Sequence, residues 1–250
     1  MEVKVNAIVT RAIDYKDNDK ILTLYSLEKG KITANIKGVK KPKAKLKFAS
    51  EPFCFAEYIL AEKGGRYTVI GASYIDSFYN LRLNISKYYL SACINDVVNN
   101  LIEEGMEDNN LFALTLQTVK SICYEENEKT SLAFFLYHIA ERLGYGIADS
   151  PCSTCLEDIK GRVFFNYQDA DFSCEDCRTQ NYSEITLDTY EALKEIKTAN
   201  LKTLSSIAIK DEKITKLIKF LLYYLSVKTE VKFKSASSLN EFFATGGGEL

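Results

Sequence analysis

Apolar and polar residues alternate along most of the first 80 positions, which is the period of a half-buried β-strand. Short turn sequences, KDNDK (16–20) and KGG (63–65), separate such runs, and their Asp, Asn and Gly residues favour turns. Five strands in succession with no helix between them predict a small closed barrel or a sandwich. The expected strands are residues 3–15, 20–26, 31–37, 53–62 and 66–76.

From residue 81 the hydrophobic period becomes helical, with apolar residues three or four positions apart. Gly105 and Gly144 are placed to end helices. An insert at about 147–182 interrupts the helices, and the final ATGGGEL (244–250) has little to bury, so we expect it to fray. The expected helices are residues 90–101, 112–123, 132–143, 186–198 and 214–225.

These patterns predict an α+β chain of more than one domain. Residues 1–80 form a five-stranded OB-type β-barrel, and residues 81–243 form an all-α helical domain that carries the insert. With 250 residues and 46% apolar composition, the chain can bury a core without crosslinks. It has no run of about 18 apolar residues and no signal-peptide pattern at its start. We therefore expect no membrane segment and a reducing, cytoplasmic environment for the seven cysteines.

The net charge of −2 conceals two parts of opposite sign. Residues 1–80 hold 14 Lys and Arg against 9 Asp and Glu, a balance of +5. The remainder holds 32 − 14 = 18 bases and 34 − 9 = 25 acids, a balance of −7. The first part alone therefore suits a polyanionic partner.

The insert contains CSTC at 152–155 and CEDC at 174–177, with eighteen residues between the pairs. This spacing is typical of a four-thiolate zinc site, because each C-x2-C pair holds one edge of the metal's tetrahedron. An iron–sulfur cluster, a redox dithiol or four free thiols are the alternatives. We predict one structural zinc ion with Cys152, Cys155, Cys174 and Cys177 as ligands, whereas Cys54, Cys93 and Cys123 fit apolar faces.

No catalytic residues are predicted. A zinc deaminase needs H-x-E, but His138 stands in HIAE, where Glu141 is one residue too distant, and four thiolates leave zinc no open position. Asp14, Asp17 and Asp19 resemble a nuclease metal cluster, yet their sequence is first of all a turn. The chain also lacks both glycine-rich phosphate-binding motifs.

The long connection GVKKPKAKLKFASEPF (38–53) is the candidate nucleic-acid site. OB barrels bind single strands by placing cations along the phosphates and stacking bases on aromatic rings. A solvated loop is the alternative interpretation. The predicted DNA-binding residues are Arg11, Lys20, Lys37, Lys40, Lys41, Lys43, Lys45 and Lys47. The candidate stacking rings, for each of which a packing role is favoured over stacking, are Tyr15, Tyr25, Phe48, Tyr58 and Tyr67.

Several short motifs together resemble the RecO family of bacterial recombination mediators. Gly38-Val-Lys-Lys-Pro-Lys43 stands at the family's basic stretch, and Pro52-Phe53 and Leu143-Gly144-Tyr145 match further positions, as do Arg11, Asp19-Lys20 and Gly30. Three positions depart from the family pattern. Ala44 replaces a serine, Leu156 replaces a glycine after the second cysteine, and QDAD (168–171) replaces a glycine pair.

The resemblance implies a nucleoid-associated DNA repair protein that binds single- and double-stranded DNA and anneals complementary strands. It also implies partnership with RecR and with the acidic tail of the single-stranded DNA-binding protein SSB, and through them the loading of RecA. An RNA-binding protein remains the alternative from the residues alone, because an OB barrel with a zinc knuckle suits RNA equally well.

Overall fold

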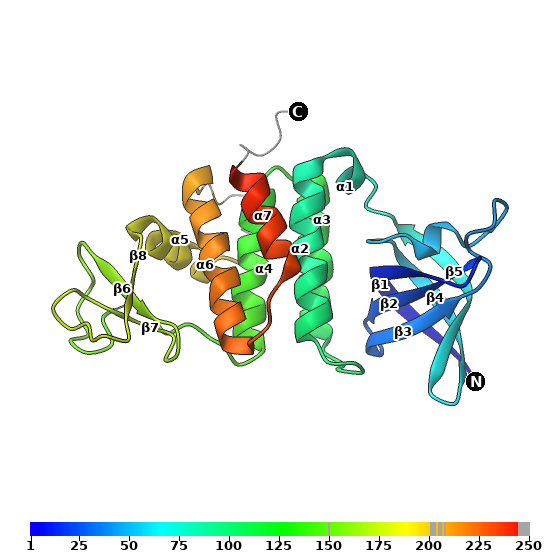
Figure 1. Cartoon of the computed structure of the whole chain (residues 1–250), viewed down its shortest axis with the longest axis horizontal. Coiled ribbons are helices and arrows are strands. Elements are labelled where there is room, and N and C mark those ends of the chain that lie inside the picture. The colour runs from blue at the N-terminus through cyan, green and yellow to red at the C-terminus, as the bar shows by residue number, and fades with distance from the viewer. Residues whose placement is uncertain (150, 201–203, 205–206, 208, 245–250) are drawn as a thin grey trace. The chain divides into compact units, whose positions relative to one another are not determined.

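The computed structural model describes residues 1–149, 151–200, 204, 207 and 209–244. Its contacts divide the chain into two compact units, Met1–Cys123 and Tyr124–Leu250. The first unit carries strands β1 to β5 and the first helices, and the second carries strands β6 to β8 and the remaining helices (Figure 1).

A five-stranded closed barrel opens the first unit, which confirms the predicted OB-type fold. The strands follow the order β1-β2-β3-β5-β4, and β4 pairs with β1 to close the ring. Neighbouring strands are antiparallel except for the parallel pair β3–β5. The strands are β1 (Glu2–Tyr15), β2 (Asp19–Ser26), β3 (Gly30–Ile36), β4 (Phe55–Lys63) and β5 (Arg66–Asp76).

Strand β1 shows why the alternating sequence closes into a barrel. Val5, Ala7 and Val9 lie two residues apart and are fully buried in the barrel core. The first half of β1 pairs with β4 and the second half with β2, with a shift of register between Val9 and Arg11. Such a bulge bends a strand, so the one long strand β1 can pair with both β4 and β2.

Gly30 belongs to a tight contact between the barrel and the loop that precedes α3. Its φ is +60°, and a Cβ at this position would lie 2.1 Å from the Met106 carbonyl oxygen. Nearby, the Gly105 N–H donates to the Lys31 carbonyl at 2.9 Å. Only glycine fits so close a backbone approach without displacement.

The helices of the first unit are α1 (Asn80–Leu83), α2 (Ile85–Leu101) and α3 (Asn109–Tyr124). Helix α2 begins where the Asn84 side chain accepts a hydrogen bond from the Lys87 N–H at 3.1 Å. The two long helices confirm the predicted ones but begin several residues earlier, because capping rather than the apolar stripe sets a helix start. The single turn of α1 was not predicted.

In the second unit, the three predicted helices are present and one more is found. They are α4 (Glu128–Arg142), α5 (Leu187–Thr198), α6 (Asp211–Thr229) and the unpredicted α7 (Lys234–Ala244). Only Leu239 and Phe242 of α7 are buried, which is too few for a recognisable stripe. Ala244, the first residue of the predicted frayed tail, is the last residue of α7, and 245–250 lie outside the described residues.

The insert contains a hairpin of two strands, β6 (Val163–Asn166) and β7 (Asp171–Ser173), and a third strand, β8 (Ser183–Ile185), follows it. The sheet order is β7-β6-β8. The ring of Phe165 packs against Phe172 and Phe220 with centroids 5.0 Å apart, so the sheet is fastened to α6. Across the described ranges, no helix is both long and apolar enough to cross a bilayer.

Candidate nucleic-acid interface and metal centre

Residues 37–47, called the lysine loop below, connect β3 to the short 3-10 helix η1 (Phe48–Ser50). Its six lysines, Lys37, Lys40, Lys41, Lys43, Lys45 and Lys47, are all exposed. Apolar residues anchor the loop to the barrel. Val39 within the loop and Ala49 of η1 just after it are buried in the barrel core, and Leu46 packs against that core. The sequence predicted the charges but not this anchoring.

Hydrogen bonds between residues three apart hold the lysine loop in successive turns. The N–H groups of Lys41, Ala44 and Lys47 donate to the carbonyls of Gly38, Lys41 and Ala44 at 3.3, 3.0 and 3.4 Å, respectively. The buried Tyr58 hydroxyl donates to the Ala49 carbonyl at 2.9 Å and fixes η1 from inside the barrel. The lysines therefore stand on an ordered backbone and lose less freedom when an anion binds.

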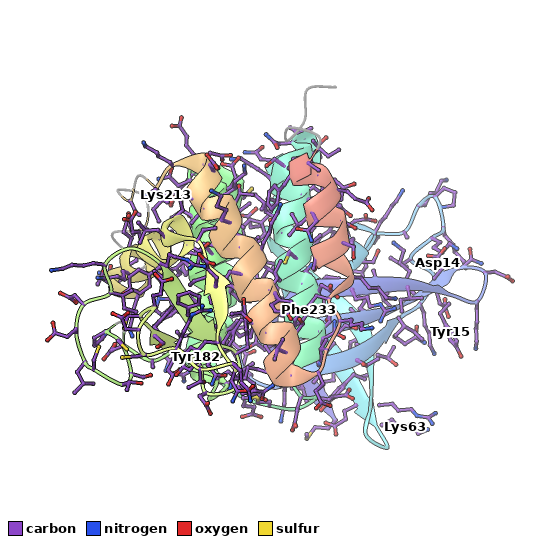
Figure 2. All side chains as sticks on the ribbon, turned by 60° about the vertical axis from the view of Figure 1, so that its left-hand side comes forward. Asp14, Tyr15, Lys63, Tyr182, Lys213 and Phe233 are labelled. Atoms are coloured by element: carbon purple, nitrogen blue, oxygen red, sulfur yellow. The ribbon has the colours of Figure 1, made fainter. Side chains whose placement is uncertain are left out.

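The turn between β1 and β2 also supports the loop. The Asp19 carboxylate accepts a hydrogen bond from the Gly38 N–H at 2.8 Å, and the Asn18 carbonyl accepts one from the Lys40 N–H at 3.0 Å. Figure 2 labels Asp14 and Tyr15, the last residues of β1 before this turn, and Lys63, the last residue of β4. Asp19 thus has a structural role, as its turn sequence predicts.

Two of the predicted DNA-binding lysines are paired with the protein's own acids. Lys40 Nζ lies 2.6 Å from the Asp14 carboxylate, and this hydrogen bond holds the pKa of Asp14 below its ordinary value. Lys20 Nζ lies 3.6 Å from Glu51. Within the described part of the chain, no carboxylate comes within ion-pair distance of the other five lysines of the loop, so most of its charge is available to a partner.

Arg11 and the five candidate stacking rings differ in their exposure to solvent. Arg11 is exposed on β1 opposite Thr23 of β2. Of the candidate stacking rings, Tyr25 and Tyr58 are fully buried, so packing is their role. Tyr15, Phe48 and Tyr67 retain at least partial exposure. Tyr74, which no sequence pattern singled out, is more exposed than any of the five candidates.

The second candidate site is the four-cysteine cluster of the insert. The Sγ atoms of Cys152, Cys155, Cys174 and Cys177 all lie within 4.8 Å of one another. A tetrahedral zinc ion with Zn–S bonds of about 2.3 Å needs sulfurs about 3.8 Å apart, so the cluster needs little contraction. The two C-x2-C pairs, although distant in sequence, are thus brought together as predicted, and they can hold a metal ion.

Each cysteine pair is shaped by a backbone turn. The Leu156 N–H donates to the Cys152 carbonyl at 2.9 Å, and the Arg178 N–H donates to the Cys174 carbonyl at 3.2 Å. Leu156 has φ of +61° and Ala170 has φ of +59°. Leu156 and QDAD (168–171), the segment that contains Ala170, replace glycines of the family pattern noted above. Both residues nevertheless adopt the left-handed conformation, which a side chain disfavours.

The proximity of the sulfurs changes their acidity. Burial raises the pKa of the Cys152 thiol, but backbone hydrogen bonds from Cys155, Cys174 and Thr154 outweigh it and lower that pKa to about 6. The hydrogen bond with the Cys174 side chain raises the pKa of Cys177 to about 12. The thiols therefore do not all ionise at the same pH, whereas a divalent cation bound among them favours the thiolate form of all four.

The alternative metal sites find no support. Among the described residues, the four cysteines are the group of His, Cys, Asp and Glu side chains close enough to share a metal ion. Neither His138 nor the three aspartates of the first turn belongs to it. Glu141 instead accepts a hydrogen bond from the Tyr137 hydroxyl at 2.7 Å. Cys54, Cys93 and Cys123 are buried, as their apolar surroundings predict.

Comparisons with known proteins agree with this architecture. A family model described as "Recombination protein O N terminal" matches residues 1–78, and one described as "Recombination protein O C terminal" matches residues 82–237. The DNA repair protein RecO of Pelotomaculum thermopropionicum is 30% identical, covering 96% of this chain and 94% of that protein. The DNA repair protein RecO of Desulforamulus reducens is 27% identical, with 98% and 96% covered.

Proposed function

Because this chain belongs to the RecO family of DNA repair and recombination proteins, we propose that it is a non-enzymatic mediator that binds single- and double-stranded DNA through its barrel. The observation that carries the proposal is the lysine loop, whose six exposed lysines stand on an ordered backbone anchored in the barrel core. In this proposal residues 1–80 form the DNA-binding domain. The proposed contacts are Arg11, Lys20, Lys37, Lys40, Lys41, Lys43, Lys45 and Lys47.

The chemistry of lysine supports strand annealing as the activity. Lysine neutralises phosphates as a compact charge and reads no bases. Two complementary strands repel each other through their phosphates, so a cationic surface that binds both backbones reduces this repulsion. Base edges stay free to pair because the contacts lie on the backbone. No bond is made or broken, so annealing needs no catalytic residue.

We propose that the cysteine cluster holds one structural zinc ion. Four thiolates match the preference of zinc for soft tetrahedral ligands. They also fill its coordination sphere, which leaves no position for a reactive water. The zinc ion would therefore brace the insert, whose sheet packs on α6 through Phe165 and Phe220.

From its family we also propose its partners. These are RecR, the acidic tail of SSB and, through them, RecA. A groove of about 270 Å³ between α6 and α7 suits an acidic tail, because Lys219 and Lys232 flank the apolar Leu222 and Phe233 (Figure 2 labels Phe233). In a pull-down with RecR and with an SSB tail peptide, we expect both to be retained. Retention of neither would contradict these partnerships.

RNA binding is the second candidate, because lysine contacts to phosphates do not distinguish the two nucleic acids. We expect a labelled single-stranded DNA bound to the protein to be displaced by unlabelled DNA at lower concentration than by RNA of the same length and sequence. A fluorescence-anisotropy competition at fixed salt measures this. Tighter competition by RNA would favour the RNA-binding function instead.

A further inference from the structure

An aromatic pair, Phe48 and Tyr74, lies next to the lysine loop, because Phe48 directly follows Lys47. Tyr74 of β5 is 59% exposed. Its cross-strand neighbour is Ala56 of β4, which is fully buried in the core. Directly opposed residues share one face of a sheet, so Tyr74 stands on the inner face of the barrel wall and yet reaches solvent. A large ring at such a position is normally covered.

The contacts of Tyr74 hold its ring in place without covering it. Its hydroxyl donates to the Ser77 Oγ at 3.4 Å and accepts from the Ser77 N–H at 3.2 Å. Its ring meets Phe48 of η1 edge to face, with centroids 6.0 Å apart and planes at 67°. Because the two rings are not stacked on each other, ring surface remains available to another flat group.

Cationic residues lie near both ends of the short η1 segment, which carries Phe48. Lys45 and Lys47 are exposed and lie three residues and one residue before Phe48. After η1, the Arg82 guanidinium donates to the Pro52 carbonyl at 3.2 Å, and this arginine is exposed as well. An uncovered ring flanked by cations suits a ligand that alternates flat apolar groups with phosphates, which is the chemistry of a single nucleic-acid strand.

We propose that Tyr74 and Phe48 form a stacking platform for unpaired bases, with Lys45, Lys47 and Arg82 holding the adjoining phosphates. This inference rests on the proposed nucleic-acid binding and adds a reason for the protein to distinguish single strands from duplexes. In a duplex the base faces are already stacked on one another, so they are not available to stack on these rings. The lysine loop, in contrast, serves both forms through their phosphates.

The chain contains no tryptophan, which permits a direct test. Tyr74→Trp introduces a single tryptophan at the platform, and Tyr223→Trp on α6 is a matched control, because Tyr223 is 57% exposed. Stacking on a base should quench the emission of the first variant when a thymidine oligonucleotide binds. We expect no quenching for the control, nor for Tyr74→Trp with an abasic oligonucleotide of the same length.

Affinities give an independent readout. Tyr74→Ala should weaken binding of single-stranded DNA by at least about fivefold, the lower end for loss of one stacked base. Duplex binding and the salt dependence should stay unchanged, and Tyr74→Phe should bind like the wild type. Equal binding of single strands by Tyr74→Ala and wild type, or equal quenching in both tryptophan variants, would overturn the platform alone. Failure of the wild type to bind any DNA would overturn the proposed function with it.

Discussion

Replacing Cys152 with serine is expected to release the metal ion and to unfold the insert. Serine cannot supply a soft thiolate, so the tetrahedral site loses one of four ligands. Structural zinc in small domains contributes about 10–16 kcal/mol of binding free energy at neutral pH, and that energy is linked to folding. Metal content measured by mass spectrometry should fall from one ion per chain to near zero, and the melting temperature should fall with it. Cys174→Ser should behave alike.

Cys123→Ala provides the control for this experiment. Cys123 is also buried but lies on α3, outside the cluster. Its truncation removes packing and lowers stability, yet the metal content should remain at one ion per chain. DNA binding should survive in Cys152→Ser, because the barrel belongs to the other compact unit. A Cys152→Ser protein that keeps both its metal and its melting temperature would show that the four-cysteine assignment is wrong.

Replacing Lys40, Lys41 and Lys43 together with alanine is expected to weaken DNA binding for all sequences alike. Each lysine that no longer neutralises a phosphate lowers the log–log salt slope for single strands by roughly 0.7. Because Lys40 is partly engaged by Asp14, we expect the triple variant to neutralise between two and three fewer phosphates. The slope should then flatten by about 1.4 to 2.1, and, if the two proteins bind alike at about 1 M salt, binding at about 0.1 M should weaken about 25- to 125-fold.

The matched control removes the same charge elsewhere on the barrel. Lys4, Lys63 and Arg66 are exposed and lie outside the lysine loop, so changing all three to alanine alters net charge equally. Titrations at several salt concentrations should show a nearly wild-type slope for this control. If the two triple variants lose affinity to the same degree, general charge rather than the lysine loop would explain binding. An unchanged slope in the loop variant would mean that the loop is merely solvated.

Prediction from the sequence succeeded where the signal was local. The strand alternation, the helical stripes and the C-x2-C pairs each depend on residues close together in the chain, so their physical consequences can be read directly. Helix α7 and strand β8 were missed for the same reason. Each buries few residues of its own and depends on packing against elements that are distant in sequence.

The candidate site divides in the same way. The charges of the lysine loop are evident in the sequence, but the ion pair of Lys40 with Asp14 joins residues 26 positions apart. Exposure of aromatic rings was harder still. Tyr58 and Tyr74 both lie on strands and both face residues of the barrel interior, yet the first is buried and the second is open to solvent.

By itself, the sequence determined the barrel, most of the helices, the four sulfur ligands and the sign of the charge on the lysine loop. These follow from residue type and short-range spacing. Only the tertiary structure decided which lysines are engaged by acids, how Val39 and Ala49 anchor the loop, and that Tyr74 remains uncovered beside Phe48. The burial of a side chain and its ion pairs depend on which distant segments come into contact, and the spacing of residues along the chain does not specify those contacts.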